Sequence, residues 1–246
     1  MKVHIKRSFD SSCSTYDESC DIQRMVASHL AGQITGKHTD ILEIGTGTGI
    51  FTSELASKYV DASVTCVDVA HSLLAEARVK HPKNRYVCAD AERLPMAGQS
   101  FDLIASSSTL QWFGKPEKSI PNMLSNLISG GQFAFSVFVD GTFQEMSILN
   151  GMTGFGSVYN LRPDSDYMEI LKGYDVQFET KEYVLYFDTV KDFLKKQKGT
   201  GATFTGMSKF SSKSSYQKFL ELYPELFGED GKIPVTYNIF YAVGKV

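Results

Sequence analysis

The sequence predicts an α/β protein built on a mostly parallel, seven-stranded sheet with helices on both faces. Short apolar runs alternate with helix-like stretches from residue 40 to residue 139. This alternation is typical of βαβ units, which place neighbouring strands in parallel. A glycine-rich turn joins the first of these strands to a helix, and two further strand-like runs at 181–187 and 235–243 complete the sheet.

Composition narrows the class of protein. The 246 residues are 42% hydrophobic and 22% charged, which is enough to bury a sizeable core. The formal net charge of −3 argues against a general nucleic-acid binder. The longest uncharged run, 119–139, is too polar to span a membrane, and we expect no signal peptide because the first residues have no apolar core. The four cysteines lack metal-like spacing, so we expect reduced thiols, no metal and a cytoplasmic location.

The expected elements form one domain with four parts. We expect an arm and helix over 1–36, a cofactor-binding core over 37–140, a lid or acceptor region over 141–180, and C-terminal strands and helices over 181–246. In the first part, Thr15-x-x-Glu18 is typical of a capping box and predicts a helix from Asp17 to Ile34. The remaining pattern predicts strands at 40–44, 64–68, 85–88, 101–105 and 132–139, and helices at 51–59, around 73–77, 116–128, 190–198 and 212–223.

The glycine turn indicates a nucleotide-sized ligand. Gly45, Gly47 and Gly49 let the backbone approach a ligand closely, and the following helix directs free N–H groups at it. The dinucleotide fingerprint G-x-G-x-x-G requires glycine at position 50, which is Ile50. Glu43 before the turn would repel a pyrophosphate but suits a cation. The turn therefore favours S-adenosylmethionine, which carries positive charge and no phosphate, over a nicotinamide dinucleotide.

Acidic residues follow the next two strands. Asp68 ends the second strand, where a carboxylate can accept hydrogen bonds from ribose hydroxyls; capping of the following helix is the alternative. Asp90 follows the third strand and could accept from an adenine amine, or could lie in a solvated turn. The carboxyl ends of parallel strands meet at one edge of the sheet. We therefore expect a nucleoside site at this edge.

Several motifs carry a family resemblance. The stretches 43–49, 90–95 and 101–104, together with Asp68, resemble the ordered motifs of class I S-adenosylmethionine-dependent methyltransferases. One branch of that superfamily, the malonyl-acyl-carrier-protein O-methyltransferases of biotin synthesis, is similar over further stretches: 7–10, 15–18, 23–24, 110–112, 135–138, 141–145, 193–195 and 201–202. The stretch 151–174, where acyl recognition would lie, matches least.

The resemblance implies a Rossmann-like fold and a reaction. A methyl group would pass from S-adenosylmethionine to the free carboxylate of malonyl-acyl-carrier protein, giving the methyl ester that starts pimeloyl assembly for biotin. The residues expected to bind the cofactor are Glu43, Gly45, Thr46, Gly47, Gly49, Asp68, Val69, Asp90, Ala91, Glu92 and Ser106. Two alternatives remain: a methyltransferase acting on another small acid or a quinone-type ring, and a non-catalytic S-adenosylmethionine-binding regulator.

A carboxylate acceptor needs no general base, because it is already ionised at neutral pH. Catalysis then consists of aligning the reactants and excluding water. Tyr16 at the end of the arm is expected to close over the methyl donor or orient the carboxylate, unless it is only a packed aromatic. Gln111 and Trp112 follow the fourth strand on the acceptor side, where Trp112 could wall the pocket or belong to the core.

Charge also indicates a partner surface. Between Val190 and Leu220 there are seven lysines and one acid, Asp192. Acyl carrier proteins are acidic, so the segment Lys191–Lys218 is a candidate docking face. The alternative is a solvated surface balanced by the acids that follow it: Glu221, Glu225, Glu229 and Asp230.

Overall fold

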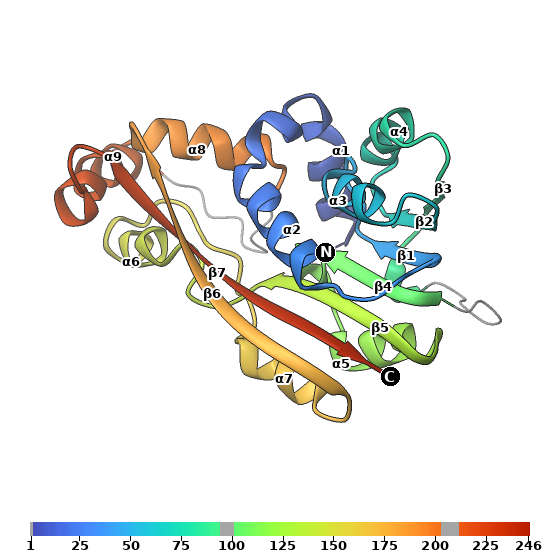
Figure 1. Ribbon diagram of the computed structural model, residues 1–246. Helices are drawn as coiled ribbons and strands as arrows, with labels where there is room; N and C mark the ends of the chain where they lie inside the picture. The colour runs from blue at the N-terminus through green and yellow to red at the C-terminus, as the bar shows by residue number, and fades with distance from the viewer. Residues whose placement is uncertain (1, 94–100, 203–211) are drawn as a thin grey trace.

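The computed structural model describes residues 2–93, 101–202 and 212–246 (Figure 1). The described residues form a seven-stranded sheet of order β3-β2-β1-β4-β5-β7-β6, in which β1 to β5 are parallel and β7 runs antiparallel to both of its neighbours. The predicted fold class is confirmed. The strands are β1 (Asp40–Ile44), β2 (Ser63–Asp68), β3 (Arg85–Cys88), β4 (Phe101–Ser107), β5 (Leu127–Phe138), β6 (Asp175–Phe187) and β7 (Ile233–Lys245).

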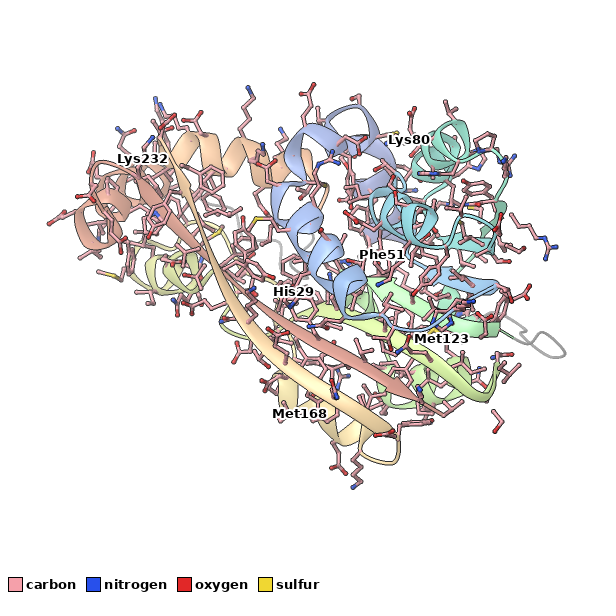
Figure 2. The ribbon with its side chains drawn as sticks, in the orientation of Figure 1. His29, Phe51, Lys80, Met123, Met168 and Lys232 are labelled. Atoms are coloured by element: carbon pink, nitrogen blue, oxygen red, sulfur yellow. The ribbon has the colours of Figure 1, made fainter. Side chains whose placement is uncertain are left out.

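Helices cover both faces of the sheet. Buried side chains of α2 and α3 form one core with the first face, while α5 and α7 form the other core with the opposite face. Figure 2 shows Phe51 on the α3 side and Met123 and Met168 on the α5 and α7 side. The helices are α1 (Lys2–Ser19), α2 (Asp21–Gln33), α3 (Ile50–Lys58), α4 (His71–Lys80), α5 (Pro116–Leu124), α6 (Gln144–Thr153), α7 (Asp164–Leu171), α8 (Val190–Gly199) and α9 (Lys213–Phe227), with short 3₁₀ turns η1 (Ala91–Arg93) and η2 (Leu110–Trp112).

Alternation along β1 decides which side chains reach which face. Ile41 belongs to the core under α2 and α3, whereas Leu42 and Ile44 belong to the opposite core. Successive side chains of a strand point to opposite faces. Glu43 therefore faces the same side as Ile41, toward α3.

The last two strands extend well beyond the parallel part of the sheet. β6 and β7 pair along their whole length, from Asp175↔Lys245 to Phe187↔Ile233. Figure 1 shows them as two long, curved ribbons with α6, α8 and α9 gathered at one end. Only 181–187 is predicted from the sequence for β6. The strand also includes 175–180, where Val176 and Phe178 alternate with polar residues and the backbone pairs with β7.

The N-terminal region differs from its prediction. The chain forms two helices, α1 and α2, that break at Cys20, in place of an arm followed by one helix from residue 17. The predicted capping box is wrong, since Thr15 lies inside α1 and its hydroxyl donates to the carbonyls of Ser12 and Gly199. α1 has few apolar residues of its own. Contacts with distant segments hold it in a helix, and a local sequence pattern does not report them.

Further boundaries differ from those predicted. α5 ends at Leu124 and not at residue 128, and β5 begins at Leu127 and not at residue 132. The side chains of Ser125 and Asn126 donate to the last carbonyls of the helix and so terminate it. Leu94 and Pro95 of the 90–95 motif and Lys209 of the predicted docking segment lie outside the described residues. None of the helices in the described part of the chain is both long and apolar enough to cross a membrane.

Candidate functional site

The turn after β1 requires glycine. Gly45 has a φ of 76°, and a Cβ there would lie 1.9 Å from Oγ1 of Thr109. Its N–H donates to the Val67 carbonyl over 2.7 Å, which ties the turn to the end of β2. Gly47 has a φ of 56°, and its N–H donates to the Asp68 carboxylate over 2.8 Å. The turn is thus fixed in a conformation that leaves its backbone open to a ligand.

Asp68 is held by backbone N–H groups. One carboxylate oxygen accepts from Gly47 and the other from Ala70, each over 2.8 Å. Burial raises the pKa of this carboxyl, while these hydrogen bonds act to lower it. Asp68 therefore shapes the turn before α4 without capping the helix, because the N-cap residue is Ala70 and no side chain caps α4. Each of its oxygens also keeps a lone pair that can accept from a ligand hydroxyl.

A cavity opens at this edge of the sheet, and we call it the strand-end cavity. Its volume is about 110 Å³. Seven of the residues predicted to bind a cofactor line it: Gly45, Thr46, Gly47, Asp68, Val69, Asp90 and Ala91. The other side chains that line it come from α1, α2 and the segment from the end of β4 to just past η2, and include Lys2, Ile5, Phe9, Tyr16, Gln23, Ser107, Ser108, Thr109, Trp112 and Phe113.

Two of the predicted cofactor residues lie beneath the cavity and not in its lining. Glu43 is 1% exposed, and its carboxylate accepts from the Thr52 hydroxyl of α3 over 2.7 Å. Burial raises the pKa of Glu43 to about 7. The hydroxyl of Ser106 is also buried and donates to the Ile44 carbonyl over 2.9 Å. For both residues the structure supports a role in holding the turn, in place of the expected contact with the cofactor.

Two more predicted residues act from outside the lining. Gly49 caps α3 with a φ of 89° and lies against His81. The Glu92 carboxylate accepts from the backbone N–H groups of Gly114 and Lys115 and pairs with Lys2. Burial opposes ionisation of Glu92, but these partners hold its pKa at about 2. Glu92 therefore fastens the end of β3 to the start of α5.

Helix α1 crosses the strand ends and closes the strand-end cavity. Asp17 accepts from Thr48 in the turn after β1 and pairs with Lys80 of α4, which Figure 2 labels beside α1. Asp10 accepts from the backbone and the hydroxyl of Ser72 after β2. Lys2 pairs with Asp90 after β3. One face of this helix thus reaches the ends of three successive strands.

A second cavity of about 490 Å³ lies next to the first, and we call it the lid cavity. Among its described lining residues there is no histidine, aspartate or glutamate, and one cation, Lys198. The lid cavity can therefore hold a bulky group but offers no evident general base. Its lining is Phe9, Tyr16, Gln23, Ser108, Gln111, Trp112, Phe138, Thr142, Phe143, Met146, Gly156, Ser157, Val158, Tyr159, Leu161, Leu194, Gln197, Lys198, Thr200 and Ala202.

The two cavities share the side chains of Phe9, Tyr16, Gln23, Ser108 and Trp112, which we call the junction. The Phe9 ring meets Trp112 edge-on at 5.9 Å, and the Trp112 ring lies 4.9 Å from that of Tyr159. Burial of the Tyr16 hydroxyl raises its pKa well above the ordinary value, so the hydroxyl keeps its proton as a hydrogen-bond donor. Aromatic rings at the junction can exclude water from a reaction there.

The predicted catalytic residues come together at this place. Tyr16 and Trp112 belong to the junction, and Gln111 lines the lid cavity beside them while donating to the Ser108 carbonyl over 2.7 Å. Trp112 is half-buried and belongs to neither core cluster, which argues against the core alternative. Sequence reasoning gave no role to Phe9, Gln23 or Ser108. Phe9 and Gln23 lie in stretches that carried the resemblance, whereas Ser108 has no local signal.

Comparisons with known proteins point to the same class of protein as the sequence motifs. A family model described as a methyltransferase domain matches residues 42–135. A malonyl-[acyl-carrier protein] O-methyltransferase of Geobacter sulfurreducens is 30% identical, with 98% of this chain and 97% of the relative covered. One from Priestia megaterium is 28% identical, with 96% and 95% covered. Among solved structures, the N-methyltransferase NodS of Bradyrhizobium japonicum with S-adenosylhomocysteine superposes with a TM-score of 0.57 at 14% identity, covering 98% of each chain, and supports the fold alone.

Proposed function

Because the chain belongs to the family of malonyl-[acyl-carrier protein] O-methyltransferases, we propose that it methylates the free carboxylate of a malonyl group carried by acyl carrier protein. S-adenosylmethionine supplies the methyl group on a positively charged sulfur. The product is the methyl ester that begins pimeloyl assembly for biotin. One observation carries the proposal. The strand-end cavity, lined by Asp68 and Asp90, meets a lid cavity whose described lining holds no general base.

The residues of the strand-end cavity suit the methyl donor. Asp68 offers two oxygens to ribose hydroxyls, and Asp90 offers an acceptor to the adenine amine. The glycine turn presents backbone rather than side chains to the amino-acid part. A cavity of about 110 Å³ is small beside the roughly 300 Å³ or more typical of ligand sites. We therefore expect the side chains of α1, Lys2 in particular, to move aside when the donor enters.

The lid cavity suits a carboxylate acceptor. A hydroxyl or ring carbon would need a base to remove its proton, whereas a carboxylate is already anionic. The junction supplies donors and aromatic walls, so the protein contributes alignment and exclusion of water. The lid segment 156–161 and α8 also line this cavity and would hold the thioester arm.

The test is methyl transfer to a panel of acceptors. Labelled S-adenosylmethionine is incubated with malonyl carrier protein, malonyl coenzyme A, free malonate and acetyl carrier protein. We expect a base-labile methyl ester on the malonyl thioesters and none on acetyl carrier protein, which lacks the free carboxylate. Label on none of the malonyl compounds, or equal label on acetyl carrier protein, would overturn the proposal.

We also propose that the carrier protein docks on the Lys191–Lys218 segment. Lys191, Lys195 and Lys198 of α8 are exposed, and Lys198 lines the lid cavity. An acidic carrier protein bound to these lysines of α8 would lie next to the cavity that its acyl arm has to enter. Lys196 is engaged by Asp21 over 2.8 Å and is a poorer choice for mutation.

Charge reversal tests this docking surface. Replacing both Lys191 and Lys195 by glutamate should raise KM for malonyl carrier protein about 10-fold and spare malonyl coenzyme A. Lys83→Glu, an exposed lysine between α4 and β3, is the matched control and should change neither KM. Equal effects of the double variant on both substrates would refute docking on α8.

A further inference from the structure

Ser108 has an unusual backbone. It follows β4 with a φ of 57°, a left-handed conformation that side-chain-bearing residues seldom adopt. Its N–H donates to the Ser136 carbonyl over 2.9 Å, and its carbonyl accepts from Gln111 over 2.7 Å. These bonds hold the residue from both sides. Such strained positions concentrate at functional sites, because the surrounding structure has to maintain them.

The side chain of Ser108 also lacks a partner. Its Oγ is shielded from solvent and makes no hydrogen bond to any described residue. The neighbouring hydroxyls differ, since Ser107 accepts from Ser136 and Thr109 donates to the Ser107 carbonyl. A buried hydroxyl without a partner destabilises the folded protein, and native structures rarely leave one. The strained backbone therefore holds in place a hydroxyl that does not stabilise the folded protein.

The position of Ser108 indicates what this hydroxyl could bind. Ser108 lines both the strand-end cavity and the lid cavity, so it lies where a methyl donor and an acceptor would meet. A carboxylate is an acceptor-only group and requires donors. Lys198, the one cation in the described lining of the lid cavity, is an exposed residue of α8. A neutral hydroxyl at the junction can orient a carboxylate and leave its charge on the reacting oxygen.

We propose that the Ser108 hydroxyl donates a hydrogen bond to the acceptor carboxylate and positions it for methyl transfer. This inference rests on the proposed carboxylate acceptor. Ser108 would act together with the Tyr16 hydroxyl, another donor of the junction. The carboxylate is common to all malonyl thioesters. The contribution of Ser108 should therefore be independent of the carrier.

Two substitutions separate the hydroxyl from the backbone. Ser108→Ala removes the hydroxyl and keeps the unfavourable φ, whereas Ser108→Gly removes the hydroxyl and relieves that strain. We expect kcat/KM to fall about 10- to 100-fold in both variants, the effect of losing one hydrogen bond to a charged group. The loss should be equal for malonyl carrier protein and malonyl coenzyme A. Affinity for S-adenosylmethionine, measured by calorimetry, should not change.

The controls distinguish failure of the Ser108 inference from failure of the proposed function. Ser57→Ala, an exposed position on α3, should keep the activity of the unmodified enzyme. If the unmodified enzyme methylates no malonyl thioester, the proposed function fails before Ser108 is tested. If it does and both Ser108 variants retain full kcat/KM, the inference about Ser108 alone is overturned. A parallel loss of S-adenosylmethionine affinity or of thermal stability in Ser108→Gly would equally overturn it, because the role would then be structural.

Discussion

The strand-end cavity and the lid cavity share five side chains but are built in different ways. The strand-end cavity is made largely by residues 44–51, 67–73 and 89–91, each set following one strand of the parallel sheet. The lid cavity draws on α1, η2, the end of β5, the segment 142–161 and α8, which are distant in sequence. Methyl-donor recognition can thus be set by short local motifs, while acceptor recognition depends on how remote segments pack.

Removing the Asp68 carboxylate is the strongest test of this contrast. Asp68→Asn places an amide where two backbone N–H groups and the ribose require acceptors, so one donor is left facing another. We expect affinity for S-adenosylmethionine to fall about 100- to 1000-fold by calorimetry, since charge-assisted hydrogen bonds are lost. KM for malonyl carrier protein should change little at saturating donor. A similar rise in the Kd for S-adenosylmethionine and in the KM for malonyl carrier protein would show that the two cavities are not separable. Asp61→Asn, on the exposed turn before β2, is the control.

The same contrast explains what the sequence could predict. Gly45, Gly47, Asp68 and Asp90 directly follow strands whose apolar runs are easy to find, so their common location follows from the parallel sheet. The assignment of Glu43 to the cofactor overlooked strand alternation, which directs its side chain under α3. The lid cavity could not be assembled from the sequence, because nothing local places 156–161 or α8 beside Trp112. The free hydroxyl of Ser108 depends on a φ that no sequence pattern reports.

Glu43 gives a prediction about stability. Its carboxyl has a folded-state pKa of about 7 against an ordinary value of 4.5. As pH rises through this window the unfolded chain loses its proton first, so ionisation of Glu43 progressively destabilises the folded state. Between about pH 5 and about pH 8 this costs up to about 2.5 kcal/mol. Glu43→Gln, which cannot ionise, should not incur that loss.

The measurement is urea unfolding of both proteins at the two pH values. Other titrating groups are common to the two proteins and cancel in the difference. The variant should gain stability relative to the unmodified protein as pH rises. If the unfolding free energies of the two proteins changed in parallel with pH, the pKa of Glu43 would not be raised in the folded state.

Tyr16→Phe tests the junction itself. The Tyr16 hydroxyl keeps its proton because burial raises its pKa, and it lies close to Gly47, 3.7 Å from where a Cβ would be. Losing this donor should lower kcat about 10-fold with little change in affinity for S-adenosylmethionine. Tyr186→Phe on β6, whose hydroxyl binds Glu229 at the surface, is the matched control. Unchanged turnover in Tyr16→Phe would leave Tyr16 as a wall of the cavity without a polar role.

Substitution of Lys2 should give the smallest effect, and it tests most directly whether α1 covers the strand-end cavity. Its ammonium pairs with Asp90 and Glu92 and lies 5.4 Å from the centre of the Phe113 ring. Lys2 thus occupies the Asp90 carboxylate, which we assign to the adenine amine. S-adenosylmethionine therefore has to displace Lys2 when it binds. Lys2→Ala should therefore tighten S-adenosylmethionine binding about 3-fold, since a part-exposed ion pair contributes up to about 1 kcal/mol. Arg7→Ala, an exposed cation on the same helix, should leave affinity unchanged. Weaker binding in Lys2→Ala would reverse the assignment, because Lys2 would then help to hold the donor and not compete with it.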